Sequence, residues 1–204
     1  MLSNTEIVNS ALTLIGERPI MSIEDDTVVA RAVSSVLPVA IRDFLSDETN
    51  WNCAIETFKL NKLVNTDPTG RFANVYQLPN SPERIRILDI LIPGYQYQIS
   101  DRAYSRELED KSMKYYIQGN FLYSDLDEVT ISYIKYIEPS EFSSYMLDAF
   151  SKKLAYELTF FLTSSTSSAA ALRELADNRL RKARSKNALE KNSYLYNFDI
   201  VRSR

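Results

Sequence analysis

The sequence has no histidine and only one cysteine, Cys53. Histidine is the side chain best suited to proton transfer near neutral pH and the commonest metal ligand, so its absence excludes histidine-dependent catalysis and histidine metal centres. A single cysteine can form neither a disulfide within the chain nor a thiolate metal cluster. We therefore predict a fold without covalent cross-links, no cofactor and no enzymatic activity.

The sequence also lacks a long apolar run and an excess of positive charge. No stretch approaches the roughly 18 to 20 apolar residues of a membrane-spanning helix, and residues 1–4 lack the basic start of a signal peptide. The formal net charge is −3 and the isoelectric point is about 5.2, whereas a protein held to phosphate by charge alone is strongly basic. We expect a soluble, unprocessed chain without a membrane partner, and nucleic acid is not its default partner.

The N-terminal region contains two segments with helical periodicity. Ser3 and Glu6 form a candidate capping box, and Gly16 suits the residue after a last turn, so the first helix should end just before it. The second helix is predicted to begin at Asp26, whose carboxylate can accept hydrogen bonds from the free N–H groups of a first turn. Pro38 interrupts the apolar pattern, and we expect a kink or a break into two short helices there.

From Trp51 to about residue 137 the periodicity is alternating instead of helical. The clearest strand runs from Val129 to Ile137. Gly119-Asn120 has the composition of a two-residue turn that closes a hairpin with positive φ angles. We predict a small antiparallel sheet or sandwich of roughly five to seven strands. Its other strands are 84–92, 95–99 and the two arms of the hairpin, 115–118 and 121–123.

Helical spacing returns after Pro139. A serine-rich turn at 163–168 separates two long helices, the second of which is predicted to span 169–192, and the two should pack as an antiparallel pair. Residues 193–204 carry aromatic side chains without helical spacing, and we interpret them as a C-terminal arm. The apolar stripe of the first long helix consists of Met146, Leu147, Phe150, Leu154, Leu158, Phe161 and Leu162.

The two ends of the chain share helical periodicity and its middle does not, so we expect the ends to come together in one bundle. We predict an α+β fold. A helical bundle formed by residues 1–50 and 138–192 carries an inserted small antiparallel β module, 51–137, and the C-terminal arm follows at 193–204.

Three segments occur in a fixed order along the chain. They are Ala11-Leu12-Thr13-Leu14-Ile15-Gly16-Glu17-Arg18-Pro19-Ile20, then Trp51-Asn52-Cys53-Ala54, and then a series from Tyr76-Gln77-Leu78-Pro79 and Arg84-Ile85 through Tyr133-Ile134 to Leu154-Ala155-Tyr156-Glu157-Leu158. Together they resemble the tail tubular protein A family, the head-to-tail adaptors of short-tailed bacteriophages. Pro38 and the short β region depart from the family pattern.

The resemblance implies a structural virion protein. It implies a ring of about twelve copies that binds the portal protein on one side and the tail nozzle protein on the other. Genomic DNA would pass through the lumen without sequence-specific contact. The implied location is the virion tail, after assembly in the host cytoplasm.

Two segments are candidates for partner contacts. The basic segment 173–186 forms a solvated helix face, or pairs with acidic groups of a neighbouring subunit or the portal. The arm carries so many aromatic side chains that leaving it in water would expose apolar area, and we expect it to become ordered on a partner. The predicted portal- or partner-binding residues are Arg179, Arg181, Arg184, Tyr194, Tyr196, Phe198 and Ile200.

Two other functions compete with this interpretation. A DNA-binding regulatory protein would use the basic helix 173–186 against phosphates, but the net charge and the lack of a helix-turn-helix pattern oppose it. A metal hydrolase would use carboxylates, and the tightest acidic cluster is Glu24-Asp25-Asp26. Acidic residues at a helix start stabilise its positive dipole end and need no metal.

Overall fold

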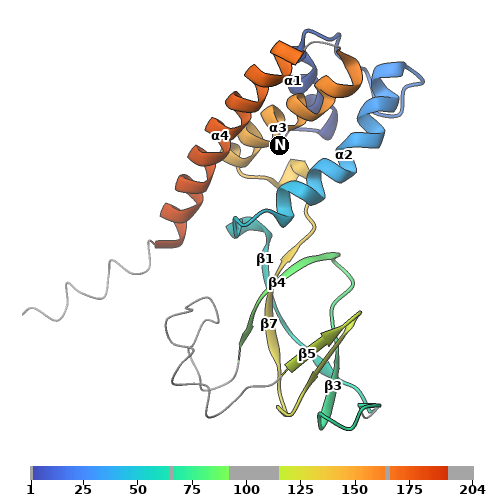
Figure 1. Cartoon of the computed structure of the whole chain (residues 1–204), viewed down its shortest axis with the longest axis vertical. Helices are drawn as coiled ribbons and strands as arrows, with labels where there is room; N and C mark the ends of the chain where they lie inside the picture. The colour runs from blue at the N-terminus through green and yellow to red at the C-terminus, as the bar shows by residue number, and fades with distance from the viewer. Residues whose placement is uncertain (1, 65–66, 92–114, 164–165, 193–204) are drawn as a thin grey trace, which may run out of the picture. The chain divides into compact units, whose positions relative to one another are not determined.

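The computed structural model describes residues 2–64, 67–91, 115–163 and 166–192. The chain divides into a helical unit, Met1–Ala54 with Ile137–Arg204, and a β unit, Ile55–Tyr136 (Figure 1). The sequence placed these boundaries at 50/51 and 137/138. The described residues form four α-helices and seven strands in two antiparallel sheets, so the predicted α+β class is confirmed.

The first helix, α1 (Asn4–Ile15), begins and ends as predicted. The Glu6 N–H donates to Ser3 Oγ at 3.2 Å and the Ser3 N–H donates to the Glu6 carboxylate at 2.7 Å, which completes a capping box. At the other end Gly16 has a φ of +80°, a conformation that costs glycine little, and its N–H donates to carbonyls of the last turn. The buried residues of α1 are Ile7, Val8, Ala11 and Leu12.

The second helix, α2 (Val28–Ser46), differs from the prediction at two points. Thr27, not Asp26, caps it, because the Ala30 N–H donates to Thr27 Oγ1 at 3.1 Å. Asp26 instead forms an ion pair with Arg31 on the surface. Pro38 lies inside one continuous helix, so the predicted break is wrong. A proline removes one main-chain hydrogen bond, and the buried face of α2 on either side of Pro38 holds the helix together.

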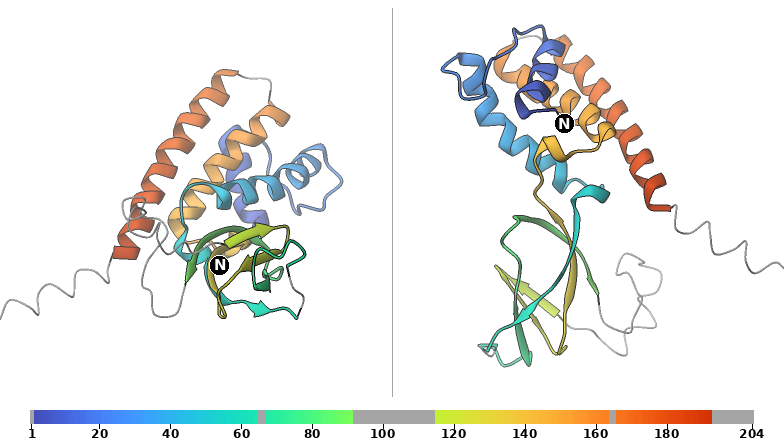
Figure 2. Two further views of the ribbon diagram at one scale, coloured as in Figure 1. Left: turned by 60° about the horizontal axis from the view of Figure 1, so that its bottom comes forward. Right: turned by 180° about the vertical axis from the view of Figure 1, so that it is seen from behind.

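A short 3₁₀ turn, η2 (Pro139–Glu141), precedes α3 (Ser144–Leu162), and α4 (Thr166–Asn192) follows it. The central helix is α3, because α1, α2 and α4 all pack on it, and α4 lies beside it along much of its length (Figure 2). A second 3₁₀ turn, η1 (Asn52–Ala54), belongs to the same unit.

An aromatic cluster fills the core of the helical unit. Trp51 is fully buried, stacks on Phe44 with ring centroids 5.0 Å apart, and donates its indole N–H to the Phe44 carbonyl at 3.1 Å. Phe142 and Phe150 contact Phe44 and each other. The tryptophan that sequence analysis assigned to the start of the β module is therefore part of the helical core.

The β unit contains two antiparallel sheets. One has the order β1-β7-β4 and consists of β1 (Ile55–Lys59), β7 (Thr130–Lys135) and β4 (Arg84–Leu91). The other has the order β2-β3-β6-β5 and consists of β2 (Asn61–Lys62), β3 (Asn74–Gln77), β6 (Phe121–Ser124) and β5 (Tyr115–Gln118). The predicted strand 95–99 lies outside the described residues.

The two sheets share one apolar core, and the predicted hairpin is one of its parts. Between β5 and β6 only Gly119 has a positive φ, +57°, so Asn120 does not take the positive angle that the sequence suggested. The buried core residues are Leu60, Tyr76, Leu78, Ile90, Leu122, Val129, Ile131 and Tyr133. In the described part of the chain no helix combines the length and the apolar character that crossing a bilayer requires.

Candidate interaction surface

The basic segment 173–186 lies on α4, and part of it is used inside the helical unit. The guanidinium of Arg184 pairs with the Asp47 carboxylate, and its Nε–H donates to Thr49 Oγ1 at 2.8 Å. Arg179 forms an ion pair of 3.3 Å with Asp148 of α3. Two of the three arginines predicted to bind a partner therefore join α4 to the rest of its own unit.

Asp148 is the acidic centre on α3 that receives these cations. Lys152, one turn later, donates to its Oδ1 at 2.6 Å, and Arg179 contacts its other oxygen. Burial alone would raise the pKa of Asp148, but Lys152, Arg179 and the more distant Lys186 outweigh burial and hold that pKa below its ordinary value of 3.8. The carboxylate is therefore charged at neutral pH and neutralises part of the basic segment.

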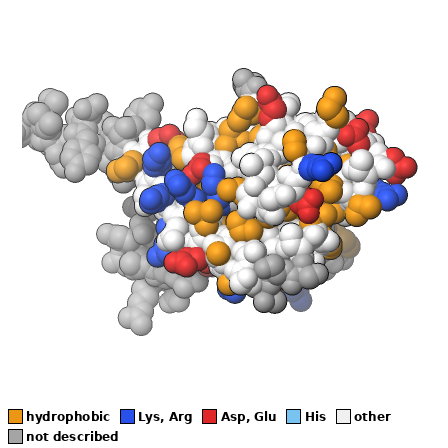
Figure 3. Space-filling view, turned by 90° about the horizontal axis from the view of Figure 1, so that it is seen from above, with side chains coloured by type: hydrophobic (Ala, Val, Ile, Leu, Met, Phe, Trp, Pro, Cys, Tyr) orange, Lys and Arg blue, Asp and Glu red, His pale blue; other side chains and the backbone are white. Residues whose placement is uncertain are grey.

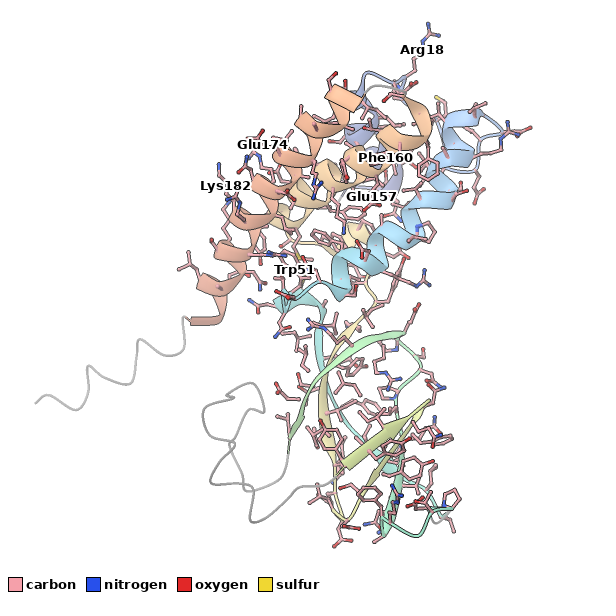
Figure 4. The ribbon with its side chains drawn as sticks, viewed as in Figure 1. Arg18, Trp51, Glu157, Phe160, Glu174 and Lys182 are labelled. Atoms are coloured by element: carbon pink, nitrogen blue, oxygen red, sulfur yellow. The ribbon has the colours of Figure 1, made fainter. Side chains whose placement is uncertain are left out.

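The remaining basic side chains lie on the surface of α4. Within the described residues, the side chain of Arg181 hydrogen-bonds to a neighbour on its own helix, donating to Asn178 Oδ1 at 2.6 Å. Lys182 projects from α4 on the side away from α3 (Figure 4). Lys and Arg side chains gather over α4 next to hydrophobic ones (Figure 3). This face thus combines positive charge with apolar area.

A shallow, open groove of about 390 Å³ lies between α3 and α4. Its apolar part contains Tyr156 and Phe160, whose rings meet edge to face with centroids 5.1 Å apart. Phe160 is 64% exposed and the adjacent Phe161 is 67% exposed. The groove is lined by Tyr156, Phe160, Ala169, Ala170, Arg173, Glu174, Asp177 and Arg181.

The groove was not predicted, because the sequence pattern gave no role to Phe160, and the pattern wrongly placed the adjacent Phe161 in the buried stripe of α3. The buried stripe ends at Leu158 and Thr159, and both phenylalanines that follow lie outside it. A signal was present: two adjacent large apolar residues on a helix point about 100° apart, so a single narrow stripe cannot bury both. Exposed aromatic side chains beside opposite charges are typical of an interaction surface.

Asn187 is a structural residue that the sequence did not reveal. It is buried on α4, where its Nδ2 donates to the Asn50 carbonyl at 2.8 Å and its Oδ1 accepts from the Asn52 N–H at 2.9 Å. Next to it Tyr145 of α3 donates to the Glu190 carboxylate at 2.6 Å. Burial and then this bond raise the pKa of Tyr145 to about 12. An asparagine inside a helix carries no sequence signal for such a role.

The other predicted sites have simpler explanations or lie outside the description. Tyr194, Tyr196, Phe198 and Ile200 are outside the described residues. In the acidic cluster Asp25 accepts hydrogen bonds from the Met21 and Ser22 N–H groups. Within the described ranges, no three acidic or cysteine side chains converge as a metal site.

A half-buried charged cluster lies in the described part of the β unit. Glu56 on β1 and Lys135 on β7 form an ion pair of 3.0 Å. Tyr133, fully buried on β7, lies opposite Glu56 in the strand register, and burial followed by the nearby Glu56 raises the pKa of its hydroxyl. Burial lowers the pKa of Arg84 on β4. In the strand register these groups lie at one end of the β1-β7-β4 sheet.

The groove between α3 and α4 combines an exposed aromatic side chain with a charged border. Comparison with known proteins adds no assignment: no family model matches the chain, and no curated protein matches its sequence.

Proposed function

We propose that the chain is a structural subunit of a head-to-tail adaptor ring in a short-tailed bacteriophage, binding the portal protein on one side and the tail nozzle protein on the other. One observation carries the proposal. Both ends of the chain build one helical unit, and the β unit is inserted between them. The sequence predicted this organisation. Three segments of the same sequence, in a fixed order, resemble the tail tubular protein A family.

The groove between α3 and α4 supports a ring because it offers a contact for a neighbouring copy. Phe160 supplies an apolar centre, and its border carries two cations, Arg173 and Arg181, and two anions, Glu174 and Asp177. Burying the aromatic ring would provide affinity. Charges of both signs at the border would fix the register between copies more than they add affinity.

The portal contact is proposed for the C-terminal arm, 193–204, together with the exposed cations of α4. Of these cations Lys182 is exposed and lies outside the groove, and Arg181 at the groove border could reach either partner, whereas Arg179 and Arg184 already have partners within the helical unit. The arm residues Tyr194, Tyr196, Phe198 and Ile200 would supply the apolar part. We propose no sequence-specific contact with the DNA in the lumen.

The test is to image the full chain mixed with its cognate portal by negative-stain electron microscopy. We expect an additional ring on one face of the portal. Phe160→Asp should prevent a complete ring, whereas Leu189→Asp, at a position 72% exposed on α4 and outside the groove, should not. Deletion from Ser193 onward should abolish docking. Unchanged portal affinity after the deletion would refute the role of the arm, and no complex with wild-type chain would refute the function.

The DNA-binding alternative makes a different prediction for the same protein. A regulator that uses 173–186 would be retained on heparin at moderate salt, because phosphate binding releases counterions and is salt-sensitive. The adaptor should pass through. The ion pairs of Arg179 and Arg184 within the helical unit reduce the positive charge that this segment can offer to phosphate.

A further inference from the structure

The edges of the two sheets in the β unit differ in how they are protected. β1 carries Glu56 and Lys59, both in ion pairs, and β2 is two residues long with Lys62 paired to Asp127. β4 carries three charged residues along its length. Short length and charge prevent an edge strand from pairing with another chain. β5, with the sequence Tyr-Tyr-Ile-Gln, carries no charged residue and is longer than β2.

β5 is exposed along its whole length. All four of its residues are exposed, with Tyr116 at 51%, Tyr115 at 44% and Ile117 at 37%. Among the described residues its only strand neighbour is β6. An uncharged edge that exposes large apolar side chains on both faces is a template for another strand.

The main chain of β5 restricts how such a strand can pair. In an antiparallel pair, alternate residues direct their N–H and C=O groups toward the neighbour and away from it. The two-residue turn places Gln118 and Phe121 as the first pair of the hairpin, which in hairpins of this length exchanges hydrogen bonds. Tyr116 then also bonds toward β6, and Tyr115 and Ile117 direct their main-chain groups outward.

We propose that a second copy of this chain pairs with β5, antiparallel and across a twofold axis, with Tyr116 opposite Tyr116 of the second copy. In this register Tyr115 of each copy lies opposite Ile117 of the other, so the outward main-chain groups form hydrogen bonds on both sides of the axis. A twofold axis perpendicular to the sheet keeps each side chain on its own face of the sheet. The two copies of Tyr116 therefore lie on one face, and the Tyr115–Ile117 pairs lie on the other.

The side chains fit this pairing without electrostatic cost. Neither copy brings a charge to the edge, so no like charges meet. The ring of Tyr116 already contacts that of Tyr123 on β6, with centroids 5.9 Å apart, and pairing extends this contact into a row of four tyrosines across both copies. Four residues per copy bury less area than a standard stable interface, so the dimer dissociates on dilution.

This inference does not rest on the adaptor function, because it concerns the free chain and a surface of the β unit alone. The test is sedimentation of the full chain over a range of concentrations. Wild type is expected to form a reversible dimer. Tyr116→Lys and Tyr116→Glu each place two like charges opposite one another, and each should weaken dimerisation by about tenfold or more.

Mixing the two variants provides the decisive measurement. In an equimolar mixture Lys lies opposite Glu only if position 116 of one copy faces position 116 of the other, and the mixture should regain the dimer. Val39→Lys, a substitution at an exposed apolar position of α2, should dimerise as wild type does. A wild type that is monomeric throughout overturns the proposal, because β5 is then covered or does not pair. A dimer insensitive to both variants, or a mixture that stays monomeric, also overturns it.

Discussion

The longest side-chain hydrogen bonds of the helical unit span more of the chain than those of the described β unit, where the Asn74 Nδ2 bond to the Leu126 carbonyl spans 52 residues. In the helical unit, Asn187 bonds to Asn52, 135 residues away, and Arg184 bonds to Asp47, 137 residues away. In the β unit, Asp67 accepts from N–H groups no more than five residues away. The last helix therefore joins the helical unit together, whereas the turn that begins at Asp67 is fixed locally.

This difference has a physical consequence for assembly of the fold. Contacts between segments far apart in sequence carry a large loop-closure cost that their packing must repay. In the helical unit the aromatic cluster around Phe44 and the hydrogen bonds of Asn187 offset this entropic cost. Trp51, the only tryptophan, lies in that cluster, so its fluorescence reports on the helical unit alone. The stability of the helical unit can therefore be measured separately from that of the β unit.

The most damaging change to the helical unit should be Phe150→Ala. Phe150 is fully buried and contacts both Phe44 and Phe142, with centroids 5.4 Å away in each case. Removing a buried phenylalanine leaves a cavity and costs about 3–5 kcal/mol of unfolding free energy. Urea unfolding followed by Trp51 fluorescence should show this loss. Leu189→Ala, at an exposed position of α4, should change the free energy by less than about 0.5 kcal/mol.

Asn187→Ala should have the next largest effect, because it tests the long-range polar link itself. The change leaves the Asn52 N–H and the Asn50 carbonyl without the bonds they make to this side chain. Unsatisfied buried polar groups cost about 1–3 kcal/mol. The matched control is Asn178→Ala on the exposed face of α4, which should be nearly neutral. Equal unfolding midpoints for the two variants would contradict the proposed dependence of the unit on α4.

Much of this fold is predictable from the sequence because its signals are local. The capping box at Ser3 and the glycine at residue 16 placed α1, and the Gly119-Asn120 turn placed the β5–β6 hairpin. The cap of α2 was predicted one residue early because Asp26 and Thr27 are both good N-caps and the sequence cannot rank them. Pro38 was predicted to kink α2 or to break it into two helices, and the break is wrong because periodicity does not measure how strongly tertiary packing holds a helix.

Less of the interaction surface is predictable. The basic segment on α4 was visible as a run of Arg and Lys, but only the structure shows that Arg179 and Arg184 bind acidic groups of their own unit. These acidic partners, Asp47 and Asp148, are distant in sequence and carry no motif. The exposed position of Phe160 depends on the phase at which α4 packs against α3. A sequence pattern shows which face of a helix is apolar, but it does not show which part of that face the neighbouring helix covers.

A third prediction tests the local character of the β unit. Bonds from Thr69 lower the pKa of Asp67, burial opposes this, and the Arg71 and Phe72 N–H groups add to the lowering. The folded state thus favours the charged carboxylate. Its stabilising effect is present above the ordinary pKa of 3.8 and is lost as pH falls through the lower folded pKa. An NMR titration of the Asp67 carboxyl carbon should therefore have a midpoint below 3.8.

Asp67→Asn should increase the amide exchange rates of Arg71 and Phe72 at neutral pH, with an effect that shrinks on acidification. The unfolding transition of the helical unit, followed by Trp51 fluorescence, should be the same as in wild type, because the substitution lies in the β unit. Asp127→Asn, at a side chain 93% exposed, is the matched control and should leave the exchange of those amides unchanged. A shift in the Trp51 transition would show that the loop also supports the helical unit.

The smallest expected effect concerns Tyr145, which joins α3 to the end of α4, and it appears only at high pH. Its pKa is raised from 10 to about 12, first by burial and then by its bond to Glu190, so the folded state holds the phenolic proton more tightly than the unfolded state does. The resulting stability is complete below pH 10 and is lost as pH rises through about 12. Urea midpoints from Trp51 fluorescence should fall more steeply over this window in wild type than in Tyr145→Phe. Every other tyrosine is common to both proteins, so parallel pH profiles would mean that the hydroxyl of Tyr145 is not held at the end of α4.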